Sequence, residues 1–209
     1  MKLNILIVLI IFAGATSCTK DNFYYSGISD GRHEGKNMLE YMQAHPYDWD
    51  STRVMIHHAG DDMVKLFEGK DERHKEFTFF GMTNHSIRRY LLQHNLKQVS
   101  DLDAEWCRTI LLKHLIDGKL YRKEIPAGEP GLYETVGTGG TTLTTLAGTK
   151  IWTYVVVEEK NGVVQHASRP IYIRFEESGR LLQVVSGDIE PDNCLVHALD
   201  YRFTIGEEE

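Results

Sequence analysis

The sequence predicts an α+β fold in which several helices precede a mainly antiparallel β-sheet. Apolar residues recur at helical spacing in the first half of the chain, whereas the second half alternates apolar and polar residues with the period of two of β-strands. Two hairpin turn signals, Asn161-Gly162 and Ser178-Gly179, separate those strands. Helices followed by a run of antiparallel strands are the order typical of this class, and 209 residues with 42% hydrophobic residues can bury a sizeable core.

The first residues are expected to be an export signal and not part of the fold. Lys2 gives a positive start, residues 3–12 are almost wholly apolar, and small residues lead up to Cys18. This pattern is typical of a cleaved signal peptide, here residues 1–17, and is too short to span a bilayer. A cysteine directly after small residues resembles a lipobox, although Ala15 stands where Leu is usual. We therefore predict that Cys18 is lipidated and begins the mature protein; the alternative is an ordinary signal with an incidental cysteine.

Residues 18–36 are predicted to be a lipid-anchored tether, because glycines and mixed charges leave them little to bury. The segment 19–22, TKDN, partly matches a signal that some Gram-negative lineages use for export to the outer face, and a plain polar linker explains it equally well. These features predict an outer-membrane lipoprotein of a Gram-negative bacterium, with surface exposure depending on that signal. The net charge of −7, without a basic stripe, disfavours nucleic acid as a partner.

Cap residues, breakers and periodic apolar positions predict the elements of the domain, which we place at residues 37–206. The helical part comprises a helix capped by Asn37 and ended by Pro46, a helix over Thr52–Gly60, a helix from Asp61 to Gly69, the strand Phe77–Phe80, a helix over Ser86–His94 capped by Thr83 or Asn84, and a helix opened by Ser100 or Asp101 that ends near Ile116. The predicted strands are Ile151–Val157, Val163–His166, Ile171–Phe175, Leu181–Val185 and Leu195–Ile205. Residues 128–149 are rich in Gly and Thr and are predicted to form an exposed loop with one poor edge strand.

Three segments also carry a family pattern in the right order. Residues 77–87, FTFFGMTNHSI, resemble a signature that reads roughly TVFAPTNxAF; residues 111–118, LLKHLIDG, resemble LLxYHVVxG; and residues 188–200, DIEPDNCLVHALD, resemble DIxxxNGVxHxID. On these motifs the chain is similar to the fasciclin domain family over about residues 37–205. The resemblance implies a wedge in which an antiparallel sheet or sandwich packs against several helices.

The resemblance further implies structural roles for the signature positions, namely Thr83, Asn84, His114, Asn193, His197 and Asp200. The chain departs from the signatures at four places: Gly81-Met82 replaces Ala-Pro, Ser86-Ile87 replaces Ala-Phe, Lys113 replaces Tyr and Cys194 replaces Gly. The Tyr-His pair at Lys113-His114 is linked with integrin recognition in some animal members. With Lys113 in that place, we expect no integrin partner.

No residue pattern indicates catalysis, a cofactor or a metal site. The ten histidines lack fixed ligand spacing, and the adjacent rings of His57 and His58 would point about 100° apart on a helix. The acidic stretch around Asp61 lacks the alternation of a calcium loop, and no Gly-x-Ser-x-Gly elbow is present. We therefore predict a non-enzymatic protein without a cofactor.

Two smaller questions stay open in the sequence. Cys107 and Cys194 could pair in an oxidising compartment, but lone cysteines in apolar segments are more often free and buried. The tripeptide at 50–52, DST, resembles an O-glycosylation acceptor at Ser51, and a helix N-cap by Asp50 or Ser51 explains it equally well.

The favoured function is that of a lipid-anchored adhesion or binding protein of the cell envelope, with a protein or glycan ligand at the cell surface. The alternative is an accessory binding subunit of an outer-membrane glycan-uptake assembly, which neighbouring transporter and hydrolase genes would favour. Two binding surfaces are candidates: the Gly/Thr loop with Thr138 and Thr141, and the outward strand face with Tyr172 and Arg174. The aromatic residues Tyr47, Trp49, Trp152 and Tyr154 could stack on sugars, with core packing as the default.

Overall fold

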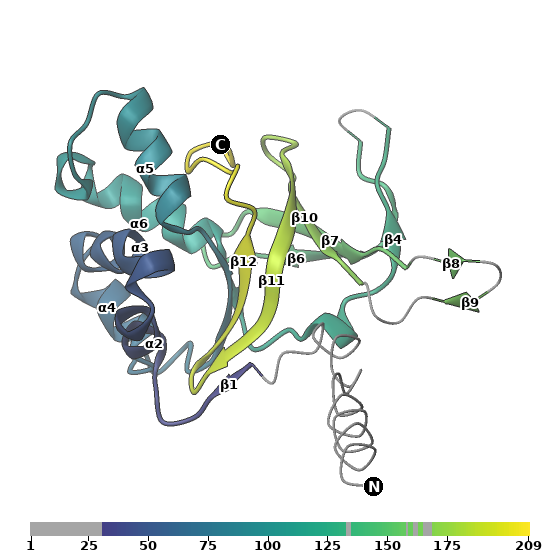
Figure 1. Cartoon of the computed structure of the whole chain (residues 1–209), viewed down its shortest axis with the longest axis horizontal. Helices are drawn as coiled ribbons and strands as arrows, with labels where there is room; N and C mark the ends of the chain where they lie inside the picture. Colours follow the sequence, from purple (N-terminus) through teal and green to yellow (C-terminus); the bar gives the residue numbers. More distant parts are fainter. Residues whose placement is uncertain (1–30, 133–134, 158, 161–162, 165–168) are drawn as a thin grey trace, which may run out of the picture.

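The computed structural model describes residues 31–209 except 133–134, 158, 161–162 and 165–168. Its helices gather at one end of a bent β-sheet (Figure 1), which is the predicted α+β arrangement. The helices are α2 (Met38–Ala44), α3 (Pro46–His58), α4 (Asp61–Phe67), α5 (Asn84–Gln93) and α6 (Ala104–Lys113), with 3-10 turns at Val99–Asp101 and Arg122–Glu124. The strands are β1 (Arg32–His33), β2 (Phe77–Gly81), β3 (Leu115–Asp117), β4 (Gly128–Glu129), β5 (Thr138–Gly139), β6 (Thr141–Thr144), β7 (Lys150–Val155), β8 (Glu159–Lys160), β9 (Val163–Val164), β10 (Ile171–Phe175), β11 (Leu181–Pro191) and β12 (Cys194–Leu199). Within the described ranges, no helix has the length and apolar character needed to cross a membrane.

The main sheet has the strand order β3-β2-β12-β11-β10-β7-β6, with β1 alongside β11. The strands of the second half pair antiparallel as predicted, but β2 pairs parallel with β12, and β1 pairs parallel with β11. The parallel β2–β12 pair was not anticipated, because a long-range pairing leaves no trace in local periodicity. It places the three signature segments side by side, since β3, β2 and β12 are neighbours in the sheet.

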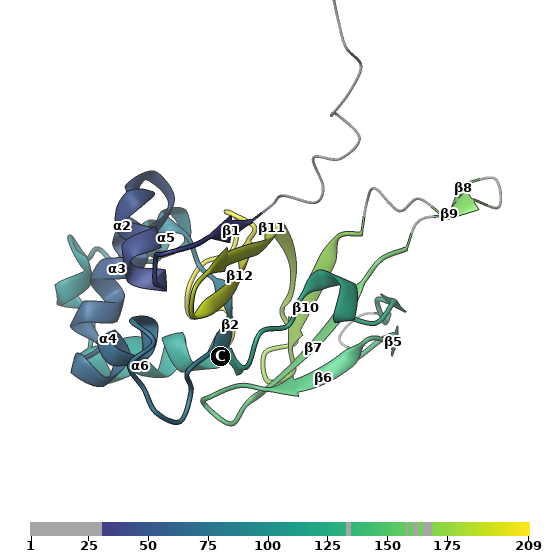
Figure 2. The same cartoon turned by 90° about the horizontal axis from the view of Figure 1, so that it is seen from below.

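Strand β11 bends the sheet into two halves. Its pairing with β12 shifts register between Val184 and Ser186 and again between Ser186 and Ile189, and Asp188 has a φ of 57°. Such bulges re-aim a strand and increase its twist. One half, β3-β2-β12, lies against the helices, and the other, β10-β7-β6, extends away from them (Figure 2).

One part of the core lies between the helices and β2, and the buried cluster continues along β7, β10, β11 and β12. Phe79 packs edge-on against Phe67 at a ring-centroid distance of 5.4 Å and faces Trp49 at 6.3 Å. The glycine at position 81 is explained by this packing, because a Cβ there would lie 2.7 Å from the Trp49 ring. One departure from the family signature, the glycine in β2, is therefore matched to a large side chain from helix α3.

Several predicted boundaries are wrong. Helix α3 begins at Pro46 and not at Thr52, because proline suits the first position of a helix as well as the end of the preceding one. Asp50 and Ser51 are consequently inside α3, which excludes the N-cap interpretation of the 50–52 tripeptide. Asn37 does cap α2, and it forms a capping box with Glu40.

The second group of helices also differs from expectation. Asp103, and not Ser100 or Asp101, caps α6 by accepting a hydrogen bond from the Trp106 N–H at 2.8 Å. The helix ends at Lys113, so Ile116 lies in β3. Strand β11 runs on to Pro191, because the turn that joins it to β12 lies at 192–193. Strand β12 already ends at Leu199, where the chain enters a turn in which Asp200 accepts from the Arg202 N–H.

Candidate binding surface

His197 occupies the centre of the signature region and is fully buried. Its Nε2 lies 2.9 Å from the Leu120 carbonyl oxygen, and its Nδ1 accepts from the Asp188 N–H at 3.3 Å. A carbonyl can only accept and an N–H can only donate, so this pair of contacts requires the neutral imidazole with the proton on Nε2. Burial, in the first place, lowers the pKa of His197 and keeps that form.

Asn193 joins the β11–β12 turn to two helices. Its Oδ1 accepts from the Met38 N–H at 2.9 Å, and its Nδ2 donates to the Phe67 carbonyl at 3.1 Å. The side chain is buried and connects the first turn of α2 with the end of α4. This arrangement gives the signature asparagine a structural task that only an amide can perform, since it donates and accepts at once.

Asn84 performs a comparable task on α3 and does not cap α5. Its Oδ1 accepts from the Ser51 N–H at 2.6 Å, and its Nδ2 donates to the carbonyls of Pro46 and Tyr47. Thr83 stands at the N-cap of α5, but its side chain makes no cap hydrogen bond. The prediction that either residue supplies a cap oxygen to α5 is therefore wrong; Asn84 ties two helices together instead.

The other two signature residues differ in the reach of their contacts, because His114 contacts distant segments and Asp200 contacts a residue two positions away. The His114 ring is fully buried at the C-cap of α6, with Nδ1 2.7 Å from the Phe80 carbonyl oxygen and Nε2 3.6 Å from the buried Glu208 carboxylate. Asp200 binds the backbone and guanidinium of Arg202, and these hydrogen bonds hold the pKa of Asp200 below its usual value. Cys107 and Cys194 are free and buried, as the apolar setting favoured, and burial raises the pKa of Cys107 to about 12.

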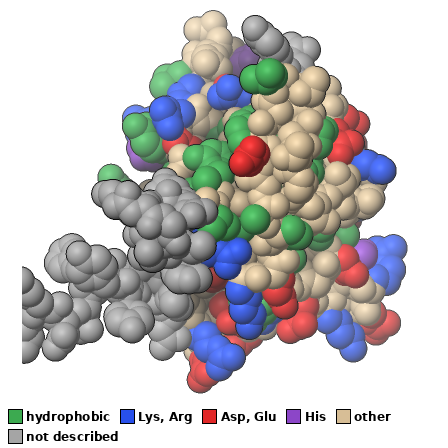
Figure 3. Space-filling view, turned by 90° about the vertical axis from the view of Figure 1, so that its right-hand side faces the viewer, with side chains coloured by type: hydrophobic (Ala, Val, Ile, Leu, Met, Phe, Trp, Pro, Cys, Tyr) green, Lys and Arg blue, Asp and Glu red, His purple; other side chains and the backbone are tan. Residues whose placement is uncertain are grey.

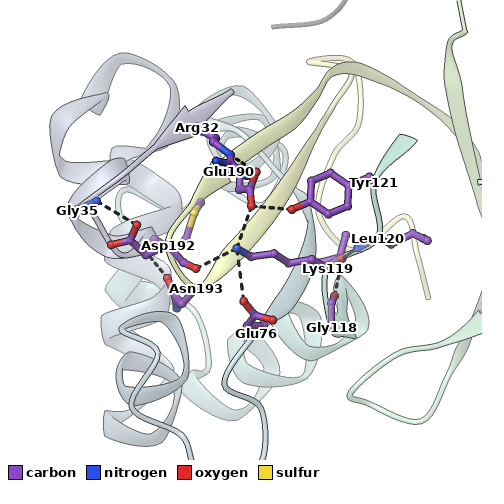
Figure 4. Close-up of polar contacts among 12 residues, drawn as sticks. Arg32, Gly35, Glu76, Gly118, Lys119, Leu120, Tyr121, Glu190, Asp192 and Asn193 are labelled. Atoms are coloured by element: carbon purple, nitrogen blue, oxygen red, sulfur yellow. Dashed lines mark hydrogen bonds and ion pairs between the residues drawn. The ribbon is translucent and has the colours of Figure 1, made fainter. Parts of the chain in front are cut away.

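A polar cluster that the sequence did not reveal lies beside the signature turn (Figure 4). Lys119 Nζ is 3.2 Å from Glu190 Oε1 and 3.0 Å from the Asp192 carbonyl oxygen, and Tyr121 Oη donates to the same Glu190 oxygen at 2.6 Å. Burial by itself would favour neutral Glu190, but the hydrogen bonds from Tyr121 and Lys119 hold its pKa below the usual value. The bond to Glu190 raises the pKa of Tyr121 to about 12.

This Lys119 cluster secures the start of the described chain. Glu190 also faces Arg32, at 3.6 Å, and Asp192 accepts from the Gly35 N–H at 3.0 Å. Strand β1 is thereby held on β11 next to the end of the predicted tether. Lys119 and Glu190 are 71 positions apart, so no local pattern could have connected them.

One predicted binding surface is contradicted. Arg174 is only 6% exposed, so it does not lie on an open strand face. Tyr172 is partly buried and stacks on Tyr154 at 5.3 Å, and Tyr154 stacks in turn on Trp152 at 4.4 Å. The period of two correctly separates the two strand faces, but the face of Tyr172 and Arg174 is largely covered. Trp49, Trp152 and Tyr154 are likewise buried, which leaves Tyr47 as the exposed member of the four aromatic candidates.

A hairpin from the Gly/Thr region provides part of that cover. We call residues 126–140 the Gly/Thr arm; its strands β4 and β5 pair with each other, and its base is bound to β7 by the Val155 N–H to the Pro126 carbonyl, at 3.1 Å. The Trp152 indole N–H donates to the Gly139 carbonyl at 3.1 Å. A Cβ at Gly140 would lie 2.6 Å from that indole nitrogen. Glycine is needed here because the backbone of the arm lies directly on the ring.

The described outer part of the arm carries exposed aliphatic side chains. Leu132 and Val136 are 80% and 45% exposed, and Thr138 is exposed in β5. Between Ile125 and Lys150 the only charged residues are Glu129 and Glu134. Figure 3 looks onto this end of the molecule: uncharged and hydrophobic side chains occupy most of its centre, with an acidic side chain among them, and many charged groups lie toward its lower edge.

The described part of the predicted loop 128–149 contains more paired strand than expected. Thr141 is partly buried and belongs to β6, which pairs with β7 along four residues and forms the edge of the sheet. The predicted edge strand is present, but Thr138–Thr144 is not a free spacer. Of the four predicted surface residues, Thr138 lies in the arm, Thr141 lies in the adjoining strand β6, and Tyr172 and Arg174 lie in the covered layer.

A metal site needs several ligating side chains gathered around one point. No group of three or more His, Cys, Asp or Glu side chains among them is placed to hold a metal ion. Cys18 lies outside the described residues. The candidate surface that emerges is thus the exposed part of the arm, held on a rigid aromatic base.

Comparisons with known proteins bear on this fold. A family model described as the fasciclin domain matches residues 52–203. Among solved structures, a pair of FAS1 domains from the insect cell adhesion molecule fasciclin I is similar, with 15% sequence identity and a TM-score of 0.47; the match covers 74% of this chain and 45% of that chain. No curated protein matches the sequence significantly.

Proposed function

On the premise that this chain belongs to the fasciclin domain family, we propose that it is a non-enzymatic adhesion module of the cell envelope, held by a lipid on Cys18. Domains of this family are in general adhesion-type binding modules. The solved relative, fasciclin I, is itself a cell adhesion molecule. For this chain the ligand is a protein or glycan at the cell surface.

The observation that carries the proposal is the build of the Gly/Thr arm. Its backbone is fixed on Trp152 and β7, while Leu132 and Val136 stand exposed at its outer part. A hairpin whose base is fixed loses less conformational entropy when it binds than a free loop would, and low ordering cost is a main source of affinity. Exposed aliphatic groups with few charges are also typical of contact surfaces.

The position of β1 supports presentation of the arm away from an anchor. In Figure 1 β1 lies at the lower edge of the sheet, whereas the arm rises at the opposite side. A tether that enters at β1 would leave the arm accessible. The Lys119 cluster would then keep the domain in a fixed relation to the anchoring point.

The anchor is tested by Cys18→Ser. We expect this variant to lose incorporation of labelled palmitate and to move from the membrane fraction to the soluble fraction. If it stays in the membrane fraction with unchanged labelling, the lipid anchor on Cys18 is excluded and another attachment must be sought.

The arm is tested by the double variant Leu132→Ser, Val136→Ser. Cells that display the wild-type chain are expected to adhere to at least one member of an array of immobilised matrix proteins and glycans, and the double variant is expected to lose that adhesion. Leu92→Ser is the matched control, because Leu92 is also exposed, at 70%, but lies on α5. All three proteins should unfold at similar temperatures, since exposed substitutions change stability by less than about 0.5 kcal/mol.

Adhesion by the double variant at the wild-type level would place recognition elsewhere on the domain. Equal loss in the double variant and in Leu92→Ser would indicate a nonspecific apolar effect and would equally contradict a role for the arm.

A further inference from the structure

A second surface feature lies far from the Gly/Thr arm, between α5 and the C-terminal turn. It is a groove of about 340 Å³. Its lining consists of Tyr90, Gln93, His94, Thr204, Ile205, Gly206, Glu207 and Glu209. This size falls at the lower end of the range of small-molecule sites, about 300–1,000 Å³.

One wall of the groove is a three-ring stack. Tyr90 stacks on His94 at a centroid distance of 4.1 Å and on Trp106 at 4.8 Å. Position 206 requires glycine for two reasons: its φ is +91°, and a Cβ there would lie only 3.2 Å from Tyr90 Cε2. The backbone at Gly206 therefore packs closely against the Tyr90 ring. Trp106 is held further by its indole N–H, which donates to Glu209 at 3.3 Å. The stack ends at the exposed imidazole of His94.

The polar groups of the groove are mainly hydrogen-bond acceptors. Glu207 and Glu209 contribute carboxylates, Gln93 contributes an amide, and no Lys or Arg is among the lining residues. A negatively charged ligand would therefore find no counter-charge in the lining. Hydroxyl donors, in contrast, would meet several acceptor oxygens.

The charges of these carboxylates are already compensated. Arg180 Nε lies 2.8 Å from Glu207, and Lys113 Nζ lies 3.8 Å from Glu209. A cationic ligand would have to compete with these partners. A neutral polyhydroxyl ligand would use the lone pairs that remain on each carboxylate without displacing them, since an ionised carboxylate offers about four acceptor positions.

We propose that this groove binds a neutral sugar, whose ring stacks on His94 and whose hydroxyl groups donate to Glu207 and Glu209. Flat apolar faces of sugar rings pack on aromatic rings, and a few fixed polar groups then set the orientation. The site is independent of the proposed role of the arm, because none of its lining residues belongs to the arm.

The test is a titration followed by NMR, using the full chain in a non-glycosidic detergent. The probes are methyl α-D-mannopyranoside, methyl β-D-galactopyranoside and cellobiose, with tetramethylammonium chloride as a cationic probe and sodium phosphate as an anionic probe. We expect at least one sugar to shift the Trp106 indole N–H and the Gly206 amide signals. The sugars are added up to about 10 mM, ten times the Kd of a millimolar site.

His94→Ala removes the open ring and is expected to weaken sugar binding by about tenfold, the equivalent of one aromatic contact. Glu207→Gln keeps an acceptor oxygen and should reduce affinity less. His85→Ala is the matched control, because it removes another exposed histidine from the same helix. This control should bind as the wild type does.

Three results would overturn the proposal: no shift with any of the sugars, shifts with tetramethylammonium or phosphate but not with sugar, or equal sugar affinity in His94→Ala and wild type. If the groove does not bind sugar, the adhesion proposal is unaffected, because adhesion is tested by substitution of Leu132 and Val136.

Discussion

Replacement of the buried imidazole in β12, His197→Ala, is expected to be strongly destabilising. The ring has no exposed surface, and it contacts two segments that lie earlier in the chain, 77 residues before it at Leu120 and 9 residues before it at Asp188. Alanine keeps the strand but removes both contacts. The substitution therefore weakens the contacts between β12 and the segments packed around it, and leaves the strand itself intact.

The magnitude follows from the groups that lose their partner. A buried backbone group left without a hydrogen bond costs about 1–3 kcal/mol. The Leu120 carbonyl makes a 2.9 Å contact and should cost near the middle of that range, whereas the Asp188 N–H at 3.3 Å should cost near its lower end. Loss of the ring beside Phe80, 5.5 Å away, adds a packing term, so the total should be about 3–5 kcal/mol.

Urea unfolding at pH 7.5 and 5.5 is the assay. Because burial lowers the pKa of His197 in the folded state, the unfolded chain binds more protons below about pH 6.5, and wild-type stability falls as the pH falls. The fall is at most about 1.4 kcal/mol per pH unit. The alanine variant lacks this titration. The difference in free energy of unfolding between wild type and His197→Ala should therefore be smaller at pH 5.5 than at pH 7.5.

Two companions sharpen the result. His197→Gln can still donate and accept but cannot titrate, so it should recover part of the lost stability. His85→Ala removes an exposed histidine and should stay within about 0.5 kcal/mol of wild type. Two results would refute the reasoning about the neutral buried ring: a decrease in the free energy of unfolding below about 1 kcal/mol in His197→Ala, or a decrease that is the same at both pH values.

Three further predictions follow from the other contacts. Asn193→Ala should lower the free energy of unfolding by about 2–4 kcal/mol, because it leaves the Met38 N–H and the Phe67 carbonyl without partners; a urea midpoint equal to wild type would contradict this. Lys119→Met should cost about 1–3 kcal/mol, discounted for its partial exposure, and should raise the apparent pKa of Glu190, which NMR titration measures; an unchanged titration would exclude the contact. Replacement of Thr138–Thr144 by a tight turn should lower the melting temperature by at least several degrees, because it removes β6 from the sheet. A melting temperature near that of wild type would show that the β6–β7 pairing contributes little to stability.

Local patterns predicted most of the elements but few of their ends. The Asn37 cap, α4, β2 and β10 were placed within a residue or so, since each depends on neighbours in sequence. The start of α3 was missed because Pro46 suits both the end of one helix and the first turn of the next.

Long-range contacts decided what the sequence could not. The parallel pairing of β2 with β12 joins segments more than a hundred residues apart, and it is this pairing that brings the three signatures together. Arg174 was expected on an open face because alternation separates two faces but does not say what covers them. The Lys119 cluster and the groove beside Tyr90 likewise combine residues from distant segments.

The sequence by itself determined the α+β class and the family, because signature residues such as Asn193 and His197 have tasks that few other side chains can perform. Only the tertiary structure decided which surface is open. The glycines of this region predicted an exposed loop, yet Gly140 is required because the backbone there lies on Trp152. The alternation of residues along a strand indicates on which face of the sheet a side chain lies. Its exposure, in contrast, depends on every segment that packs over that face.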